Sequence, residues 1–335
     1  MKPFILVSLL SAMIGFSSCN PRGGGSSTVT RATGGAYEVI VVMDKVAWDS
    51  EAGTALKEEL SAPVPYLLPA ESSMKYTYVR PDLFSGMFKY VRNILIVDIN
   101  KAVYTKVSLL NETDKWAKGQ SVLYLNAPDV KMLETYLSEN NRILINYFTK
   151  VEMNRTADFL RETYSSTVMN HVKEKFGITL YAPSEIMSQK LGKDCLWFSN
   201  DASTGRMDLL IYSFPYTDKN TFTLDYLVAK RDSFAKVMIP GGDAFPNSHM
   251  STEKRVVDYE ASTLNGKYCG ILRGWWRMEG GDMMGGPFVS YARVDEPNRR
   301  VIVTEGFVYE PRKDKRNYLR RLEASLQTMR FSDEI

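Results

Sequence analysis

Short hydrophobic runs in the first third of the chain alternate with amphipathic stretches. The run from Tyr37 to Met43 is apolar and β-branched, which predicts a buried strand, and Asp49 to Leu60 has helical spacing. Three more strands are predicted at residues 76–79, 93–99 and 121–126. We therefore expect residues 37–127 to form a small α+β domain, with helices packed on one face of a mixed sheet.

The hydrophobic period then changes to that of a helix. Between residues 129 and 176, apolar side chains recur every three or four positions, and Gly177 ends the pattern. This predicts one long helix, or two helices that meet near Asn140 and Asn141 or near Asn154. We expect residues 128–176 to connect the two halves of the chain and to bury their aromatic stripe in the core.

The second half, residues 177–335, contains mainly strand patterns. Strands are predicted at residues 178–181, 195–198, 207–214, 254–264, 267–276, 286–295 and 299–309. Helices are predicted at residues 221–237 and 313–329, and Asn265-Gly266 and Glu296-Pro297-Asn298 are typical of hairpin turns. The expected fold class is α+β, with two sheet-and-helix layered halves joined by a long helical connector. The second half would be an antiparallel meander between helices.

The first 36 residues have a different character. Lys2, an apolar stretch from Phe4 to Phe16 and small residues before Cys19 are typical of a secretory signal peptide, and the stretch is too short to span a membrane. The segment Phe16-Ser17-Ser18-Cys19 resembles a lipoprotein signal, which implies removal of residues 1–18 and acylation of Cys19. The alternative is an ordinary secretory signal in which the cysteine is incidental.

Residues 19–36 are rich in Gly, Ser and Thr and lack a regular apolar period, so we expect a flexible tether after the lipidated cysteine. No Asp or Glu lies between Cys19 and Glu38, unlike in some lipoproteins carried to the cell surface. Asn20 does not resemble an inner-membrane retention signal. We therefore expect an outer-membrane lipoprotein that faces the periplasm rather than the cell surface.

Composition narrows the classes of function. The chain has 42 Lys and Arg against 39 Asp and Glu, a balance that gives no footprint for nucleic acid. Cys195 and Cys269 lie in apolar, strand-like runs. Two alternatives stay open for them, a disulfide that an oxidising compartment would permit and a pair of buried free thiols.

Catalytic signatures are weak. The only histidines are His171 and His249, without zinc-binding spacing, and there is no CxxC pair, nucleophile elbow or phosphate-binding glycine motif. We expect no metal and no cofactor. A serine hydrolase built on either histidine, or a pair of carboxylates for glycoside cleavage, stays open because such groups meet only in the fold.

Residues 273–288 have the most unusual local chemistry, two strand-like runs flanking a glycine-rich loop with methionines. In a strand, Trp275 and Trp276 point to opposite faces, so one of them would be free to contact a protein or a glycan. The alternative is a hairpin whose glycines supply positive φ and whose tryptophans both pack under helices. The candidate partner-binding residues are Trp275, Trp276, Arg277, Glu279, Asp282, Met283 and Met284.

Two resemblances follow from these elements. The element order of the second half resembles the α/β/α sandwich of Mog1 and PsbP-type proteins. Several motifs together resemble an uncharacterised family of Bacteroidota lipoproteins, known only as a domain of unknown function, over nearly the whole mature chain. They are Glu38 to Asp44 with Trp48, Pro63-Val64-Pro65, Arg92-Asn93-Ile94, Gly285 to Phe288, and Thr304 to Tyr309.

The sequence thus predicts a noncatalytic, lipid-anchored accessory protein of the envelope that binds a periplasmic protein or another envelope component. One alternative is an envelope hydrolase acting on glycan, peptide or lipid, with Glu279, Asp282 or His249 as acid-base groups. It predicts a pocket that gathers at least two of them. Another alternative is a carrier of lipid or a small ligand, which would need a large apolar cavity.

Overall fold

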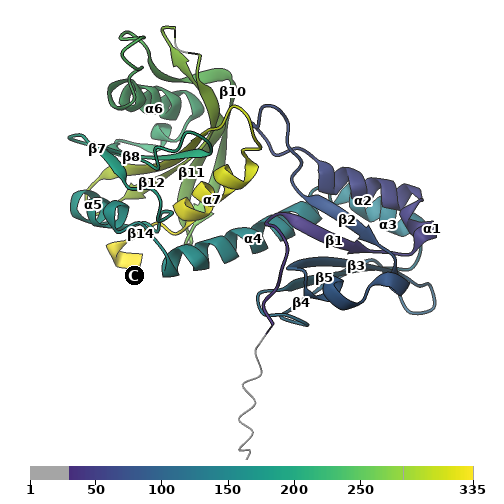
Figure 1. Ribbon diagram of the computed structural model, residues 1–335. Coiled ribbons are helices and arrows are strands. Elements are labelled where there is room, and N and C mark those ends of the chain that lie inside the picture. Colours follow the sequence, from purple (N-terminus) through teal and green to yellow (C-terminus); the bar gives the residue numbers. More distant parts are fainter. Residues whose placement is uncertain (1–29, 282, 335) are drawn as a thin grey trace, which may run out of the picture.

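The computed structural model describes residues 30–281 and 283–334. Cys19 and Asp282, both named above, lie outside the described residues. Figure 1 shows two lobes, a smaller one built from the first part of the chain and a larger one built from the second. Among the described residues, no helix combines the length and the apolar character needed to cross a membrane.

The smaller lobe contains a five-stranded sheet in the order β2-β1-β3-β5-β4. Its strands are β1 (Glu38–Val42), β2 (Lys75–Val79), β3 (Asn93–Ile99), β4 (Ser108–Thr113) and β5 (Ser121–Ala127). All neighbours are parallel except β4, which runs antiparallel to β5, so the predicted mixed sheet is confirmed. Strand β4 was not predicted, because four of its six residues are exposed and it has no apolar run.

The two faces of this sheet are covered differently. Helices α1 (Lys45–Trp48), α2 (Glu51–Ser61) and α3 (Val130–Glu139) pack on one face. Within the described residues, the opposite face is covered by two short 3-10 turns, η1 (Pro81–Leu83) and η2 (Gly86–Tyr90), and by the turn after β4. We call these the helix-covered face and the loop-covered face; in Figure 1 the helices lie above the sheet.

The predicted connector is three helices rather than one or two. They are α3, α4 (Ile143–Glu162) and α5 (Ser166–Phe176). The first break is at the predicted asparagines and includes Arg142 in the left-handed region, whereas Asn154 lies inside α4. Side chains of α3 join the core of the smaller lobe and those of α5 join the core of the larger lobe, so the stretch divides between the two lobes.

The larger lobe contains a seven-stranded antiparallel sheet in the order β10-β11-β12-β13-β9-β8-β7. Its strands are β7 (Ser188–Leu191), β8 (Cys195–Ser199), β9 (Arg206–Pro215), β10 (His249–Leu264), β11 (Lys267–Glu279), β12 (Gly285–Asp295) and β13 (Arg300–Tyr309). Asn265 and Gly266 both have positive φ, as a two-residue hairpin turn requires. Both predicted hairpins and the antiparallel meander are confirmed.

Helices cover both faces of the seven-stranded sheet. Alternate residues of a strand point to opposite faces, and in β9 both sets are apolar. Leu210 and Tyr212 pack toward α6 (Leu224–Met238), whereas Leu209 and Ile211 pack toward α5 and α7 (Arg316–Gln327). A small sheet of β6 (Ile178–Thr179) and β14 (Arg330–Phe331) lies beside them, and η3 (Lys219–Thr221) and η4 (Ser332–Glu334) complete the lobe. The fold class is α+β, as predicted.

Several contacts hold the lobes together, among them one helix pair and one carboxylate. Helix α4 extends from the smaller lobe and packs against α7 of the larger one. Glu71, in the loop before β2, accepts hydrogen bonds from the amides of Lys315 (2.7 Å) and Arg316 (2.9 Å) at the start of α7. A carboxylate at this position satisfies amides that the helix cannot pair internally.

Candidate functional site

The glycine-rich hairpin is formed by β11 and β12 of the seven-stranded sheet, and Trp276 lies in the core beneath it. Only 2% of the Trp276 side chain is exposed; its indole Nε1 donates to the carbonyl oxygen of Val308 at 3.2 Å, and its ring packs edge-on against Phe307. A Cβ on Gly286 would lie 1.9 Å from the same carbonyl oxygen, so only glycine fits there. Of the two tryptophans, Trp276 is therefore the one that packs in the core.

The other predicted partner-binding residues do not converge. Trp275 and Met284 are half-buried, while Arg277 and Glu279 are exposed. Met283 is almost fully exposed. Arg277 forms an ion pair with Glu253 of β10 at 3.6 Å. These residues spread along one hairpin, and their role in binding stays a prediction.

The acid-base groups of the hydrolase alternative are partly brought together. His249 and Glu279 are cross-strand partners on β10 and β11, with Nε2 and Oε2 3.9 Å apart. Neither side chain lines the two cavities described below. His171 lies on α5, where its ring contacts that of Phe198, and it does not belong to this pair. The hydrolase stays an alternative, but those of its predicted acid-base groups that the structure describes line neither of these two cavities.

The two described cysteines are free and buried. Cys195 packs with the α6 side of the seven-stranded sheet and Cys269 with the α5 and α7 side, so the sheet separates them and no disulfide forms. This settles the two alternatives left open by the sequence. Burial raises the pKa of each thiol to about 12, which makes both unreactive at neutral pH.

A hollow of about 660 Å³ lies at one end of the seven-stranded sheet. Because the strands are antiparallel, the end of β9, the start of β11, the end of β12 and the start of β13 meet there. The loop that leads into α6 closes the side. The lining residues are Tyr216, Thr217, Lys219, Phe222, Lys267, Tyr268, Arg293, Val294, Glu296 and Arg299.

Three aromatic rings form one wall of the hollow. Phe222 stands between Tyr216 and Tyr268, with ring centroids 6.1 Å and 4.9 Å away, and the Phe222–Tyr268 contact is edge-on. The Tyr268 hydroxyl pairs with that of Tyr259, whose pKa burial and this hydrogen bond raise. Tyr268 nevertheless remains 45% exposed, so its ring is open to a ligand.

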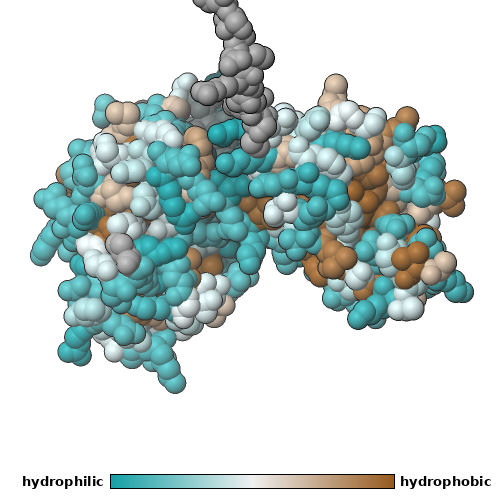
Figure 2. All heavy atoms as spheres, turned by 90° about the horizontal axis from the view of Figure 1, so that it is seen from below, coloured by the Kyte–Doolittle hydropathy of each residue, from teal (hydrophilic) through white to brown (hydrophobic). Residues whose placement is uncertain are grey.

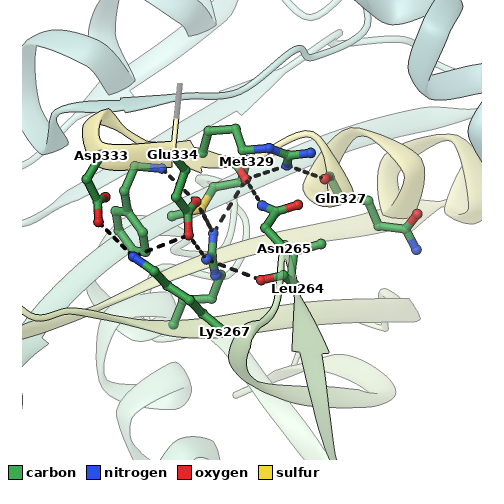
Figure 3. Close-up of polar contacts among 10 residues, drawn as sticks. Leu264, Asn265, Lys267, Gln327, Met329, Asp333 and Glu334 are labelled. Carbon is green, nitrogen blue, oxygen red and sulfur yellow. Dashed lines mark hydrogen bonds and ion pairs between the residues drawn. The ribbon is translucent and has the colours of Figure 1, made fainter.

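The C-terminal segment holds two of the lining residues, Arg293 and Lys267, in place. The buried guanidinium of Arg293 pairs with Glu334, lies near the carbonyl oxygens of Leu264 and Met329, and stacks over the Phe331 ring at 4.7 Å. Burial would raise the pKa of Glu334, but the hydrogen bonds and charge of Arg293 bring it below its usual value. Figure 3 shows this cluster, with Lys267 reaching Asp333 at 2.7 Å.

The charges of the hollow are unbalanced. Four cationic side chains line it against Glu296 alone, and two of the four, Lys267 and Arg293, are neutralised by the C-terminal carboxylates. Within the described residues, Lys219 and Arg299 form no ion pair. Rings next to such cations are suited to a ligand that has both a flat apolar face and a negative charge.

Sequence reasoning did not find this hollow. Its aromatic residues are spread over more than fifty positions, and only the fold brings them together. One local signal was present, because Lys267 and Tyr268 directly follow the predicted Asn265-Gly266 turn and must therefore lie at the end of a hairpin.

A second cavity, of about 360 Å³, lies between the lobes beside α4 and α7. At its base, Arg273 forms ion pairs with Glu323 at 2.5 Å and with Glu260 at 4.0 Å. Burial would raise the pKa of Glu323, yet Arg273 and Arg320 hold it below its usual value. This carboxylate is therefore ionised at neutral pH and has no proton to donate as a general acid.

Solved structures with weak similarity to part of the chain include two of Mog1. The Saccharomyces cerevisiae Ran-binding protein Mog1p has a TM-score of 0.31 and 8% identity over 48% of this chain and 95% of its own. A mutant of protein Mog1 has a TM-score of 0.29 and 8% identity, with coverages of 47% and 92%. No curated protein matches the chain.

The family comparison covers both lobes. Residues 32–161 match a domain of unknown function, DUF8532, and residues 165–328 match another, DUF4837. The boundary falls between α4 and α5, and the residues that line the 660 Å³ hollow all lie in the second match. Two models of domains of unknown function thus match the chain in succession, DUF8532 followed by DUF4837.

Proposed function

We propose that this chain is a noncatalytic, lipid-anchored protein of the outer membrane that binds an acidic glycan of the cell envelope. The hollow beside Tyr268 carries the proposal. Sugar rings present flat C–H faces that pack on aromatic side chains, and their carboxylates are attracted by Lys219 and Arg299. A concave site of this size can hold a few sugar units, whereas a protein partner usually binds to a flatter and larger surface.

Fixed walls support binding with little reorganisation. Arg293 and Lys267 are held by the C-terminal segment, and Phe222 supports the Tyr268 ring from behind. A preorganised site loses less conformational entropy when the ligand arrives. Little of the free energy of contact with the aromatic wall would therefore be spent on ordering the site.

The carboxylates near the hollow support a noncatalytic role. The pKa values of Asp333 and Glu334 are lowered, the first mainly by its hydrogen bond from Lys267 and the second by Arg293 against the effect of burial. Both groups are ionised at neutral pH, whereas glycoside cleavage needs a protonated carboxyl group beside the scissile bond. Binding without turnover fits this arrangement better.

The lipid anchor rests on the residues before Cys19, as argued from the sequence. In this proposal the acylated cysteine holds the folded lobes at the periplasmic side of the outer membrane, within reach of envelope glycans. The test is to replace Cys19 by Ser in the full chain and to fractionate the cells. We expect the unaltered chain in the membrane fraction and the C19S chain outside it; equal distributions would contradict the anchor.

Glycan binding is tested by calorimetric titration of the full chain with soluble disaccharide-peptide fragments of peptidoglycan. Tyr268→Ala should weaken the affinity by about tenfold, which is about 1.4 kcal/mol. Tyr164→Ala is the matched control, because Tyr164 is 41% exposed and makes a similar edge-on contact with Tyr181. No measurable binding, or equal losses in the two variants, would contradict the proposal.

The cross-strand pair of His249 and Glu279 is the observation that favours the hydrolase alternative. The same fragments, incubated with the chain and separated by chromatography, distinguish the two functions. We expect the fragments to be recovered intact. Cleavage that is lost in Glu279→Gln would replace the binding function by the enzymatic one.

A further inference from the structure

The loop-covered face of the five-stranded sheet leaves large apolar side chains in solvent. Buried Ile40, Ile94 and Val122 form its base, and in the described part of the chain the short turns η1 and η2 and the turn after β4 lie over them. These turns expose Leu83 (56%) and Met87 (79%). Contiguous apolar groups on a folded protein usually mark an interaction site.

The exposed apolar surface continues to the edge of the sheet. Leu110 of β4 is exposed and stands opposite Tyr124 of β5, on the same side as the two turns. Trp116 follows β4 and packs edge-on against Phe84, with ring centroids 5.7 Å apart. In Figure 2, which views the molecule from below, apolar colour gathers over the smaller lobe, on the right.

The chain approaches Cys19 from this same face. Thr30 accepts a hydrogen bond from the Lys118 amide at 2.8 Å, and the Thr33 amide donates to the Tyr90 carbonyl at 2.8 Å. Eleven peptide units separate Thr30 from Cys19 and span at most about 40 Å. An acyl chain on Cys19 would therefore hold Thr30, at the loop-covered face, within about 40 Å of the lipid surface.

The charges around the face fit an anionic surface. Residues 80–92 and 101–118 contain seven Lys and Arg against three Asp and Glu. The ammonium groups of Lys89 and Lys115 lie over the Trp116 ring, 5.8 Å and 5.0 Å from its centroid. Lysines beside apolar and aromatic groups extend their charge toward phosphates while their methylene groups stay on the apolar side.

We propose that the loop-covered face lies on the membrane, with Leu83, Met87 and Leu110 in the headgroup region and the lysines facing anionic lipid phosphates. The inference rests on the lipid anchor of the proposed function and adds to it a second contact with the bilayer. An apolar and basic surface next to the anchor adds its own binding free energy to the membrane attachment. It also fixes the orientation of the larger lobe toward the periplasm.

The test places one fluorescent label on each lobe of the full, lipidated chain. Cys19 is acylated in this account, and Cys195 and Cys269 are buried, so a maleimide dye reacts only with an engineered cysteine. The two positions are Met87→Cys and, as the matched control on the larger lobe, Met187→Cys, which is 66% exposed. The chain is reconstituted in vesicles of phosphatidylethanolamine and phosphatidylglycerol that contain a lipid-borne quencher.

We expect several-fold stronger quenching of the label at residue 87 than at residue 187, and a decrease at residue 87 when Leu83 and Leu110 are changed to Ser. Equal quenching in chains that float with the vesicles would overturn the membrane-facing surface and leave the anchor intact. Chains that do not float would overturn both. A change at residue 87 that follows protein concentration instead of lipid would assign the face to a second copy and overturn the proposal.

Discussion

The two sheets of this protein differ in how their faces are covered. The seven-stranded sheet has helices on both faces, and its interior charges are paired, as Arg231 and Glu305 are between α6 and β13. The five-stranded sheet has helices on one face and short turns on the other, which leaves Leu83 and Met87 exposed. The fully covered sheet therefore offers an interaction site only at its end, whereas the partly covered sheet offers a whole face.

The comparison predicts that a buried ion pair in the larger lobe matters far more than a surface pair. Both side chains of Arg231 and Glu305 are fully buried, so Arg231→Met leaves an unpaired carboxylate in the core. We expect a loss of about 3 to 5 kcal/mol in the free energy of unfolding, measured by urea denaturation.

Arg161→Met is the matched control for this prediction. Its partner Asp158 lies one helical turn away and both side chains are well exposed, so the expected loss is below about 1 kcal/mol. Similar losses of stability in the two variants would contradict the burial of the Arg231–Glu305 pair in the larger lobe.

Two tryptophans, one in each lobe, provide a second test of the difference between the two sheets. Trp276 is buried in the larger lobe and should cost about 3 to 4 kcal/mol of stability when changed to Ala. Trp116 lies half-buried on the loop-covered face and should cost less than about 2 kcal/mol. Thermal unfolding of both variants measures the difference, and an equal shift in the melting temperature would contradict the distinction between the two faces.

A smaller effect depends on pH. Burial raises the pKa of Asp208 to about 6, although Arg206 at 3.2 Å opposes the shift. The folded chain therefore binds this proton more tightly than the unfolded chain, and the stabilisation is lost as pH rises from about 4 to above 6, by up to about 3 kcal/mol.

Asp208→Asn should flatten that part of the stability profile, because the amide does not titrate. Denaturant unfolding between pH 4 and pH 7 measures the change, and Asp158→Asn, on the surface, is the control that should leave the profile as it is. An unchanged profile in Asp208→Asn would show that the carboxyl is not the group responsible.

Much of the fold could be predicted from periodicity. Apolar runs such as Asn93 to Ile99 and the Asn265-Gly266 turn define buried strands and hairpins by local chemistry alone. The strands β4 and β7 were missed because most of their residues are exposed. Pairing with a neighbour, and not the hydrophobic pattern, keeps such edge strands in place.

The site was harder to predict for a physical reason. The sequence left two interpretations of the glycine-rich hairpin, because glycines occur both in open loops and at close contacts. Gly286 is needed where the Val308 carbonyl oxygen comes too close for any side chain. Tyr216, Phe222 and Tyr268 belong to three separate segments, and their shared wall depends on strand order, which no local pattern encodes.

In the proposed arrangement the membrane contacts the loop-covered face of the smaller lobe, and the glycan contacts the larger lobe. Hydrogen–deuterium exchange of the lipidated full chain tests it directly, in detergent, in vesicles, and in vesicles with peptidoglycan fragments. We predict that vesicles protect residues 81–90 and 108–118 and that the fragments protect residues 216–222 and 265–268. Protection of the larger lobe by vesicles, or of neither region by its own partner, would contradict the account.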